Sequence, residues 1–359
     1  VPASAKEAME LITELGARVV PPSGGAVLTD GWAALAGGET VARSVDEALL
    51  IPLRHPAAFR AVLRATRASA LPPPVRPTAL MFYGPPGTGK TAAARIAAEM
   101  AGLPLVSAPL ESLISKWFGE GEQRLAALFA RCEQLGPCVL FLDELDALAG
   151  ARGRGEMHEA TRRMLSVLLR HLDGFDAVEH VALIAATNRP EDLDPALASR
   201  FDVRVHFPPP DADARARIFG RYAKQLGEEE LASLAAQSGA LSGRDILDVC
   251  KQAERRWVYS RLSEARGSYG ARTAVGTADR EDAPPLPPLP PPPLAYYEES
   301  VAERCAAVEF GHVPASADRP SGGAAQEGAP TSSSSRKARG KRRARPRREG
   351  GSSREPPRH

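Results

Sequence analysis

Eight residues from Gly84 to Thr91 have the types and the spacing that bind phosphate groups. They read Gly84-Pro85-Pro86-Gly87-Thr88-Gly89-Lys90-Thr91, which is the pattern G-x-x-x-x-G-K-T. Its glycines let backbone N–H groups close around phosphate oxygens, while Lys90 neutralises the charge of the β- and γ-phosphates and the Thr91 hydroxyl can ligate Mg²⁺. An apolar run ends at Tyr83 and an alanine-rich helix is expected over residues 92–101, so a helix N-terminus also favours the anion. The pattern predicts a nucleotide site.

Two carboxylates, Asp143 and Glu144, follow directly after another apolar run. Asp143 can hold Mg²⁺ through water, and Glu144 can polarise the attacking water. Hydrolysis needs both functions, because a metal spreads the phosphate charge and a base orients the nucleophile. Together with the loop, this pair predicts an ATPase that uses ATP and Mg²⁺.

The elements that must position these residues alternate between short apolar runs and helical stretches. Such alternation predicts an α/β fold with a five-stranded parallel sheet sandwiched by helices. Helical patterns without strands follow Pro208-Pro209-Pro210 and predict a small all-α lid domain. The expected strands are Ala79–Tyr83, Leu105–Ala108, Cys138–Leu142, Val181–Ala186 and Val203–Phe207.

Changes in composition indicate where the parts of the chain begin and end. The prolines between Leu286 and Leu294 favour polyproline II, and the Ala/Gly/Ser/Arg-rich end has too few apolar residues to fold. We expect an N-terminal extension at 1–30, a large α/β nucleotide-binding domain at 31–210, a helical lid domain at 211–266, a proline-rich linker at 267–294, a C-terminal helix at 295–308 and a disordered basic tail at 309–359.

Several stretches, in one consistent order over about residues 30–310, resemble the AAA ATPases of the AAA+ superfamily. The resemblance implies the P-loop NTPase fold. With its single ATPase unit and C-terminal helix, the chain is similar to the katanin and spastin group, and the start of its lid helix looks closest to poorly characterised plant and algal members. The stretches are Gly31–Gly37, Leu50–Pro56, the two motifs above, Ala185–Pro190, Leu193–Asp202 and Leu241–Ile246.

The resemblance implies roles for polar residues at strand ends and turns. Asn188 would be the sensor-1 residue, because an amide at a strand end can position the water opposite the γ-phosphate. Arg200 would be the arginine finger, supplied in trans to the ATP of a neighbour, which implies a ring of identical chains and most simply a hexamer. The family often has a second arginine where this chain has Val203, and we expect Arg204 to substitute for it.

The resemblance also places other residues beside the nucleotide. Ala36 and Gly37 belong to the segment near the adenine, and Gly243 and Arg244 open the lid helix. The family usually has a small residue where this chain has Arg244. Two interpretations stay open: Arg244 contacts the γ-phosphate of its own subunit, or it faces solvent.

Lys116, Trp117 and Phe118 resemble the loop that grips substrate in the pore of family rings. Two adjacent aromatic residues followed by Gly119 cannot both face one core from a regular helix. The resemblance implies a motor that remodels, unfolds or disassembles polypeptides, with Trp117 as the main contact. The alternative is a pair of core aromatics at a helix end.

The basic end of the chain favours a second function class. From Arg336 to His359 there are eleven arginines and lysines against two glutamates, whereas the whole chain has a net charge of only +2. Such a tail can contact nucleic-acid phosphates without sequence specificity or act as a nuclear-import signal, so a nucleic-acid or chromatin-associated ATPase is the alternative. A solvated tail without function is equally open.

Other features exclude or favour further classes. Glu159 follows a histidine as in zinc proteases, but Arg162 stands where the second histidine ligand would be, so a metalloprotease is disfavoured. Four scattered cysteines suit reduced thiols, and no apolar run reaches the length of a transmembrane helix. We expect an intracellular protein, leave its compartment open, and note that a chain starting at Val1 can lack its natural N-terminus.

Overall fold

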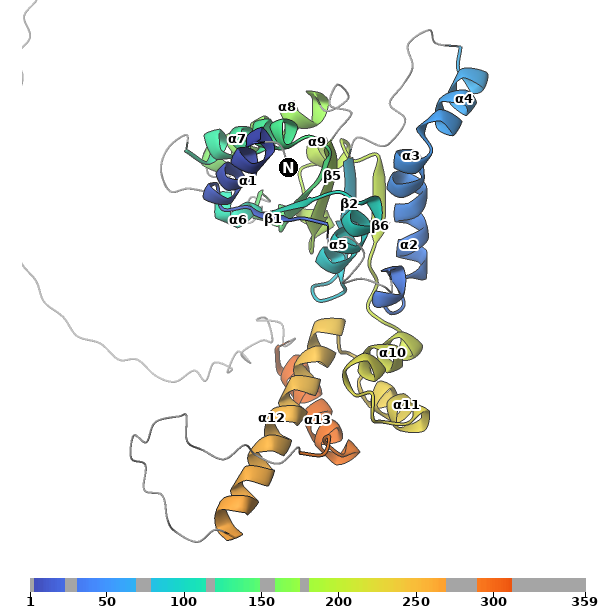
Figure 1. The fold of residues 1–359 in the computed structure, drawn as a ribbon, viewed down its shortest axis with the longest axis vertical. Helices are drawn as coiled ribbons and strands as arrows, with labels where there is room; N and C mark the ends of the chain where they lie inside the picture. The colour runs from blue at the N-terminus through green and yellow to red at the C-terminus, as the bar shows by residue number, and fades with distance from the viewer. Residues whose placement is uncertain are drawn as a thin grey trace, which may run out of the picture. The chain divides into compact units, whose positions relative to one another are not determined.

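A computed structural model describes seven stretches of the chain, and Figure 1 draws their helices and strands as a ribbon. All of them belong to one compact unit that extends to Val313. The described residues are 3–22, 31–68, 79–113, 120–148, 159–174, 181–268 and 289–311.

A six-stranded sheet forms the centre of the α/β part, in the order β1-β3-β4-β5-β2-β6. The five strands expected from the sequence pair in parallel, which confirms that prediction. The sixth strand, β1, pairs antiparallel with β3 and was not predicted. The strands are β1 (Arg18–Val20), β2 (Ala79–Tyr83), β3 (Leu105–Pro109), β4 (Cys138–Asp143), β5 (Val181–Thr187) and β6 (Val203–His206).

Helices cover both faces of this sheet, because its central strands are apolar on both sides. Every residue of β5 is buried, as is every residue of β4 except Asp143. One core contains residues of α1 (Ala3–Glu14), α6 (Leu110–Leu113), α7 (Glu120–Leu135) and α8 (Glu159–Gly174). The other contains residues of α2 (Glu39–Val45), η2 (Asp46–Leu50) and α5 (Lys90–Ala101).

A third core lies among four helices that follow the sheet. Tyr297 and Val301 of the last helix are buried in it, so this helix packs with the other three. It extends beyond the 295–308 expected from the sequence at both ends. The four helices are α10 (Ala212–Tyr222), α11 (Glu228–Gln237), α12 (Gly243–Ser268) and α13 (Leu294–Gly311).

Short elements complete the described fold. They are η1 (Gly31–Ala34), α3 (Ile51–Arg54), α4 (Pro56–Thr66), η3 (Leu145–Leu148), η5 (Pro190–Asp192) and α9 (Pro195–Ala198). None of the helices in the described stretches combines the length and the apolar character needed to cross a bilayer.

Candidate active site

The phosphate loop runs from the end of β2 to the start of α5, as the sequence predicted. Gly89 precedes α5 with a φ of +98°, a left-handed conformation that costs a side-chain-bearing residue energy. Thr88 Oγ1 donates to the carbonyl of Pro85 at 2.9 Å and closes the turn. The loop therefore directs the first turn of α5, with its free N–H groups, toward any bound anion.

The Lys90 ammonium folds back over this loop. It donates to the carbonyls of Gly84 at 2.7 Å and Pro85 at 2.8 Å, and the residue is only 7% exposed. Burial lowers the pKa of Lys90, whereas the nearby charges of Asp143 and Asp146 oppose that shift. A buried cation whose hydrogen bonds go to neutral carbonyls gains stabilisation when an anionic phosphate binds beside it.

Thr91 and Asp143 bring two oxygen donors together beside the loop. Thr91 Oγ1 donates to Asp143 Oδ2 at 2.9 Å, and Asp143 Oδ1 accepts from the backbone N–H of Glu144 at 3.0 Å. No group of three or more His, Cys, Asp or Glu gathers as a metal cage within the described stretches. This donor set fits Mg²⁺, which keeps several waters and takes few protein oxygens.

Glu144 has an unusual backbone conformation. Its φ of +58° is the only positive φ of a non-glycine residue in the described part of the chain. Such strain is often found at functional sites. Burial raises the pKa of Glu144, as do the charges of Glu111, Asp143 and Asp146, while Arg244 lowers it. A raised pKa makes this carboxylate a better proton acceptor than an ordinary surface glutamate.

Asp146 joins this site although the sequence analysis did not select it. Its Oδ1 accepts from Thr187 Oγ1 at 3.0 Å and from the backbone N–H of Asn188 at 3.1 Å. Asp146 thereby ties the end of β5, and with it Asn188, to the segment after β4. The sequence feature that could have identified Asp146 is that it is a third acidic residue, three positions after Asp143.

The segment expected near the adenine lies between the loop and α10. A side chain at Gly89 would collide with Leu35, and one at Gly37, the neighbour of Ala36, would collide with Ala214 of α10. Arg221 on α10 also donates to the carbonyl of Ala34 at 2.6 Å. The structure thus brings Leu35 close to the phosphate loop and residues 34–37 close to α10, while their contact with the adenine stays a prediction.

The start of α12 approaches the same loop. The backbone N–H of Arg244 donates to the carbonyl of Gly87 at 3.3 Å, and a side chain added at Gly243 would lie 3.3 Å from that oxygen. The charge of Arg244 lowers the pKa values of both Lys90 and Glu144. The start of α12 therefore lies against the phosphate loop, while a contact of the Arg244 side chain with the γ-phosphate stays a prediction.

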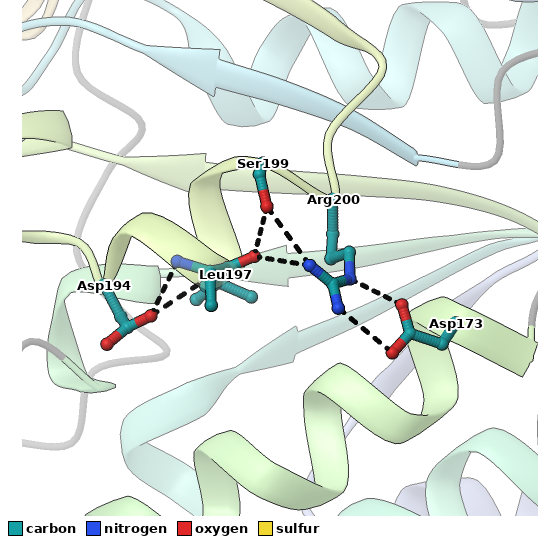
Figure 2. Close-up of polar contacts among 6 residues, drawn as sticks. Asp173, Asp194, Leu197, Ser199 and Arg200 are labelled. Atoms are coloured by element: carbon teal, nitrogen blue, oxygen red, sulfur yellow. Dashed lines mark hydrogen bonds and ion pairs between the residues drawn. The ribbon is translucent and has the colours of Figure 1, made fainter.

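Arg200 is the second residue after α9 (Figure 2). Asp194 caps that one-turn helix by accepting from the N–H groups of Ala196 and Leu197. Arg200 then donates to both carboxylate oxygens of Asp173, at 2.5 and 3.3 Å. Within the described stretches, its side-chain hydrogen bonds are to Asp173 on α8, to the carbonyl of Ala196 on α9 and to Ser199.

Arg204 is positioned separately from Arg200. It lies on β6, is exposed, and donates to the carbonyl of Ala198 at 2.6 Å. The proposed pore-loop residues Lys116, Trp117 and Phe118 lie outside the described residues, as does the basic tail. Their assignments stay predictions.

Comparisons with known proteins show which family this chain resembles. The family model described as "ATPase family associated with various cellular activities (AAA)" matches residues 80–209. The chain is 38% identical over 228 residues to a cell division cycle protein 48 homolog of Archaeoglobus fulgidus, covering 62% of this chain and 30% of that protein. It is 37% identical over 230 residues to fidgetin-like protein 1 of Homo sapiens, covering 62% and 32%. The chain thus spans about a third of the length of these curated relatives.

Among solved structures, the FIGL-1 AAA domain in complex with ADP is similar in fold. The two have a TM-score of 0.61 and 25% sequence identity, and the match covers 85% of this chain and 95% of that one. The matched family segment begins in β2 and ends after β6, so it contains the phosphate loop, Asp143 and Arg200. This segment is similar to the AAA family of ATPases, and that similarity, together with relatives named as ATPases, supports ATP hydrolysis.

Proposed function

We propose that this chain hydrolyses ATP as one subunit of a ring and uses the energy to remodel polypeptides. The observation that carries the hydrolytic part is the convergence of Lys90, Thr91, Asp143 and Glu144 where β2 and β4 end. Ligands of open parallel sheets bind at the carboxyl ends of the strands, which is where these residues lie.

Each of these residues has a chemical role in the proposed reaction. Lys90 and the N–H groups of the loop hold the β- and γ-phosphates. Glu144 accepts a hydrogen bond from the attacking water and orients it in line with the scissile bond, while the amide of Asn188 helps to position that water opposite the γ-phosphate. Thr91 and Asp143 would hold Mg²⁺, which would spread the developing negative charge.

Arg200 supports the proposal of a ring. Its side chain is 38% exposed, and it forms an ion pair with Asp173 at the end of α8. An exposed arginine presented in this way can reach the nucleotide of a neighbouring subunit. An arginine that stabilises transition-state charge accelerates phosphoryl transfer on the order of 10³-fold or more.

A complementation experiment tests this division of the active site between subunits. Arg200→Ala keeps its own catalytic residues and lacks the finger, whereas Glu144→Gln keeps the finger and lacks the base. Each variant alone should lose most ATPase activity, and mixing the two should restore part of it, because mixed rings contain complete sites. Absence of restoration in rings shown to be mixed would contradict a finger supplied in trans.

The remodelling part of the proposal rests on the similarity to AAA ATPases and on the sequence of the predicted pore loop. AAA ATPase relatives support a protein-remodelling role in general. A peptide substrate should stimulate ATPase activity, and Trp117→Ala should abolish that stimulation while leaving the basal rate intact. Tyr259→Ala is the matched control, because Tyr259 is an aromatic residue that is 75% exposed on the helical part. Equal loss in both variants would contradict a specific role of Trp117.

A further inference from the structure

Helix α13 is joined by a charged pair to the first turn of α12. The Arg304 side chain donates to Asp245 Oδ1 from Nε at 3.0 Å and from Nη2 at 2.6 Å. Asp248, one turn further along α12, lies 3.9 Å from the same guanidinium. The Asp245 side chain is only 18% exposed. The stabilisation of its negative charge therefore depends more on these hydrogen bonds than it would for a carboxylate in contact with solvent.

The other oxygen of the same carboxylate holds the residue that precedes α12. Asp245 Oδ2 accepts from the backbone N–H of Ser242 at 2.9 Å and from its hydroxyl at 2.6 Å. The N–H of Asp245 donates back to Ser242 Oγ at 3.3 Å, which completes a reciprocal cap at the helix start. Burial opposes ionisation, but the hydrogen bonds from Ser242 and Arg304 outweigh it and hold the pKa of Asp245 below its usual range.

Ser242 in turn touches the phosphate loop. Gly87 has a φ of +78°, and a side chain there would overlap the Ser242 hydroxyl and lie 3.1 Å from the β-carbon of Arg244. The N–H of Arg244 donates to the carbonyl of Gly87 at 3.3 Å. One carboxylate therefore connects α13, through the start of α12, to the loop that surrounds the phosphates.

We propose that Arg304 is a positioning residue for the nucleotide site: by holding Asp245 it keeps Ser242 and Arg244 against the phosphate loop. This inference rests on the proposed binding of ATP at that loop. Arg304 itself does not touch the nucleotide. Its effect is on affinity, because a loop pre-organised by the lid binds phosphates without first having to order its neighbours.

The same two helices offer a matched control. Arg256 of α12 pairs with Glu303 of α13 at 2.6 Å and with Glu299 at 3.6 Å. This pair also joins α12 to α13, but it lies more than two turns further along α12 from Ser242. If α13 acted only by stabilising the helical part, removal of either arginine would have the same effect on nucleotide binding.

The test uses the full chain with Arg304→Ala, Arg304→Lys and Arg256→Ala. A fluorescent ADP analogue gives the dissociation constant, steady-state assays give KM and kcat for ATP, and thermal unfolding without nucleotide gives the stability of each variant. We expect Arg304→Ala to raise both the dissociation constant and KM about tenfold while kcat changes far less. Arg304→Lys, which keeps the charge, should restore most of the affinity, and Arg256→Ala should leave the affinity close to that of the wild type.

Two results would overturn the inference. One is unchanged nucleotide affinity in a folded Arg304→Ala variant, and the other is an equal loss of affinity in Arg256→Ala at equal loss of thermal stability. A failure of the proposed nucleotide site is distinguishable from both, since then the wild type would not bind the analogue and Lys90→Ala would make no difference.

Discussion

Asp173 and Arg200 form an ion pair with two hydrogen bonds that joins the end of α8 to the second residue after α9 (Figure 2). Arg200 lowers the pKa of Asp173 mainly through the hydrogen bond and secondarily through its charge. Both side chains are at least a third exposed, so the pair adds little to stability. The ion pair instead orients Arg200, because it limits the rotamers of this arginine, which we propose contacts the nucleotide of a neighbouring subunit.

Replacing Asp173 should therefore change turnover more than stability. For Asp173→Asn we expect kcat of the assembled protein to fall several-fold, with KM for ATP and the melting temperature nearly unchanged, because one oriented contact to Arg200 is weakened. Glu159→Gln is the matched control, since it removes the ion pair with Arg163 at the other end of α8. A similar loss of turnover in both variants would show that the effect is not specific to Arg200.

The charges around Glu144 predict how activity depends on pH. The pKa of Glu144 is raised, so the carboxylate proposed as general base should be protonated, and activity lost, as the pH falls through a value above that of an ordinary glutamate. Arg244→Gln removes a charge that lowers this pKa and should move the acid limb of the pH–rate profile to higher pH. Glu111→Gln removes a charge that raises it and should move the limb to lower pH. Shifts in the same direction would contradict this account.

Asp146 should matter for turnover rather than for ATP binding. It holds the hydroxyl of Thr187 and the N–H of Asn188, so Asp146→Ala frees the segment that carries the proposed sensor. We expect kcat to fall about tenfold or more, as with other supporting hydrogen bonds around reactive groups, while the dissociation constant for ADP stays similar. Asp146→Asn keeps an acceptor oxygen and should retain more activity than the alanine variant.

The burial of His171 predicts that the folded protein loses stability as the pH falls. It stacks on Phe129 at 4.5 Å between ring centroids, and its Nε2 is buried without a hydrogen-bond partner among the described residues. Burial lowers the pKa of His171, Arg170 lowers it further and Glu133 opposes the shift. The neutral form of His171 is favoured in the folded state. The contribution of this residue to the free energy of unfolding should therefore be complete above the ordinary histidine pKa and should be lost as the pH drops below it.

His171→Phe tests that account by removing the titrating group and keeping the stacked ring. Melting temperatures are compared at about pH 7.5 and about pH 5.5, which lie on either side of the ordinary histidine pKa. The difference between the two should be smaller in this variant than in the wild type. An unchanged difference would assign the pH dependence to other groups.

Local information in the sequence predicted the nucleotide motifs and most of the sheet. Gly84–Thr91 is recognisable because a tight loop, a cation and a hydroxyl at fixed spacing are a local requirement of phosphate binding. The five parallel strands were recognisable because each is a continuous apolar run, as burial on both faces demands. The start of α13 was predicted within one residue, since Leu294 follows a run of prolines that cannot continue a helix.

Tertiary contacts decided what these local signals do not contain. β1 has only three residues, and it is a strand because it pairs with β3, which follows it by more than eighty positions. Asp146 became a site residue only when β4 and β5 were placed side by side.

The links of Arg200 to Asp173 and of Arg304 to Asp245 join residues 27 and 59 positions apart. The sequence by itself determined the chemistry available to this protein, because phosphate binding and strand formation depend on residues close together in the chain. Only the tertiary structure decided which charged side chains hold one another, because such pairs depend on packing between helices that no local pattern specifies.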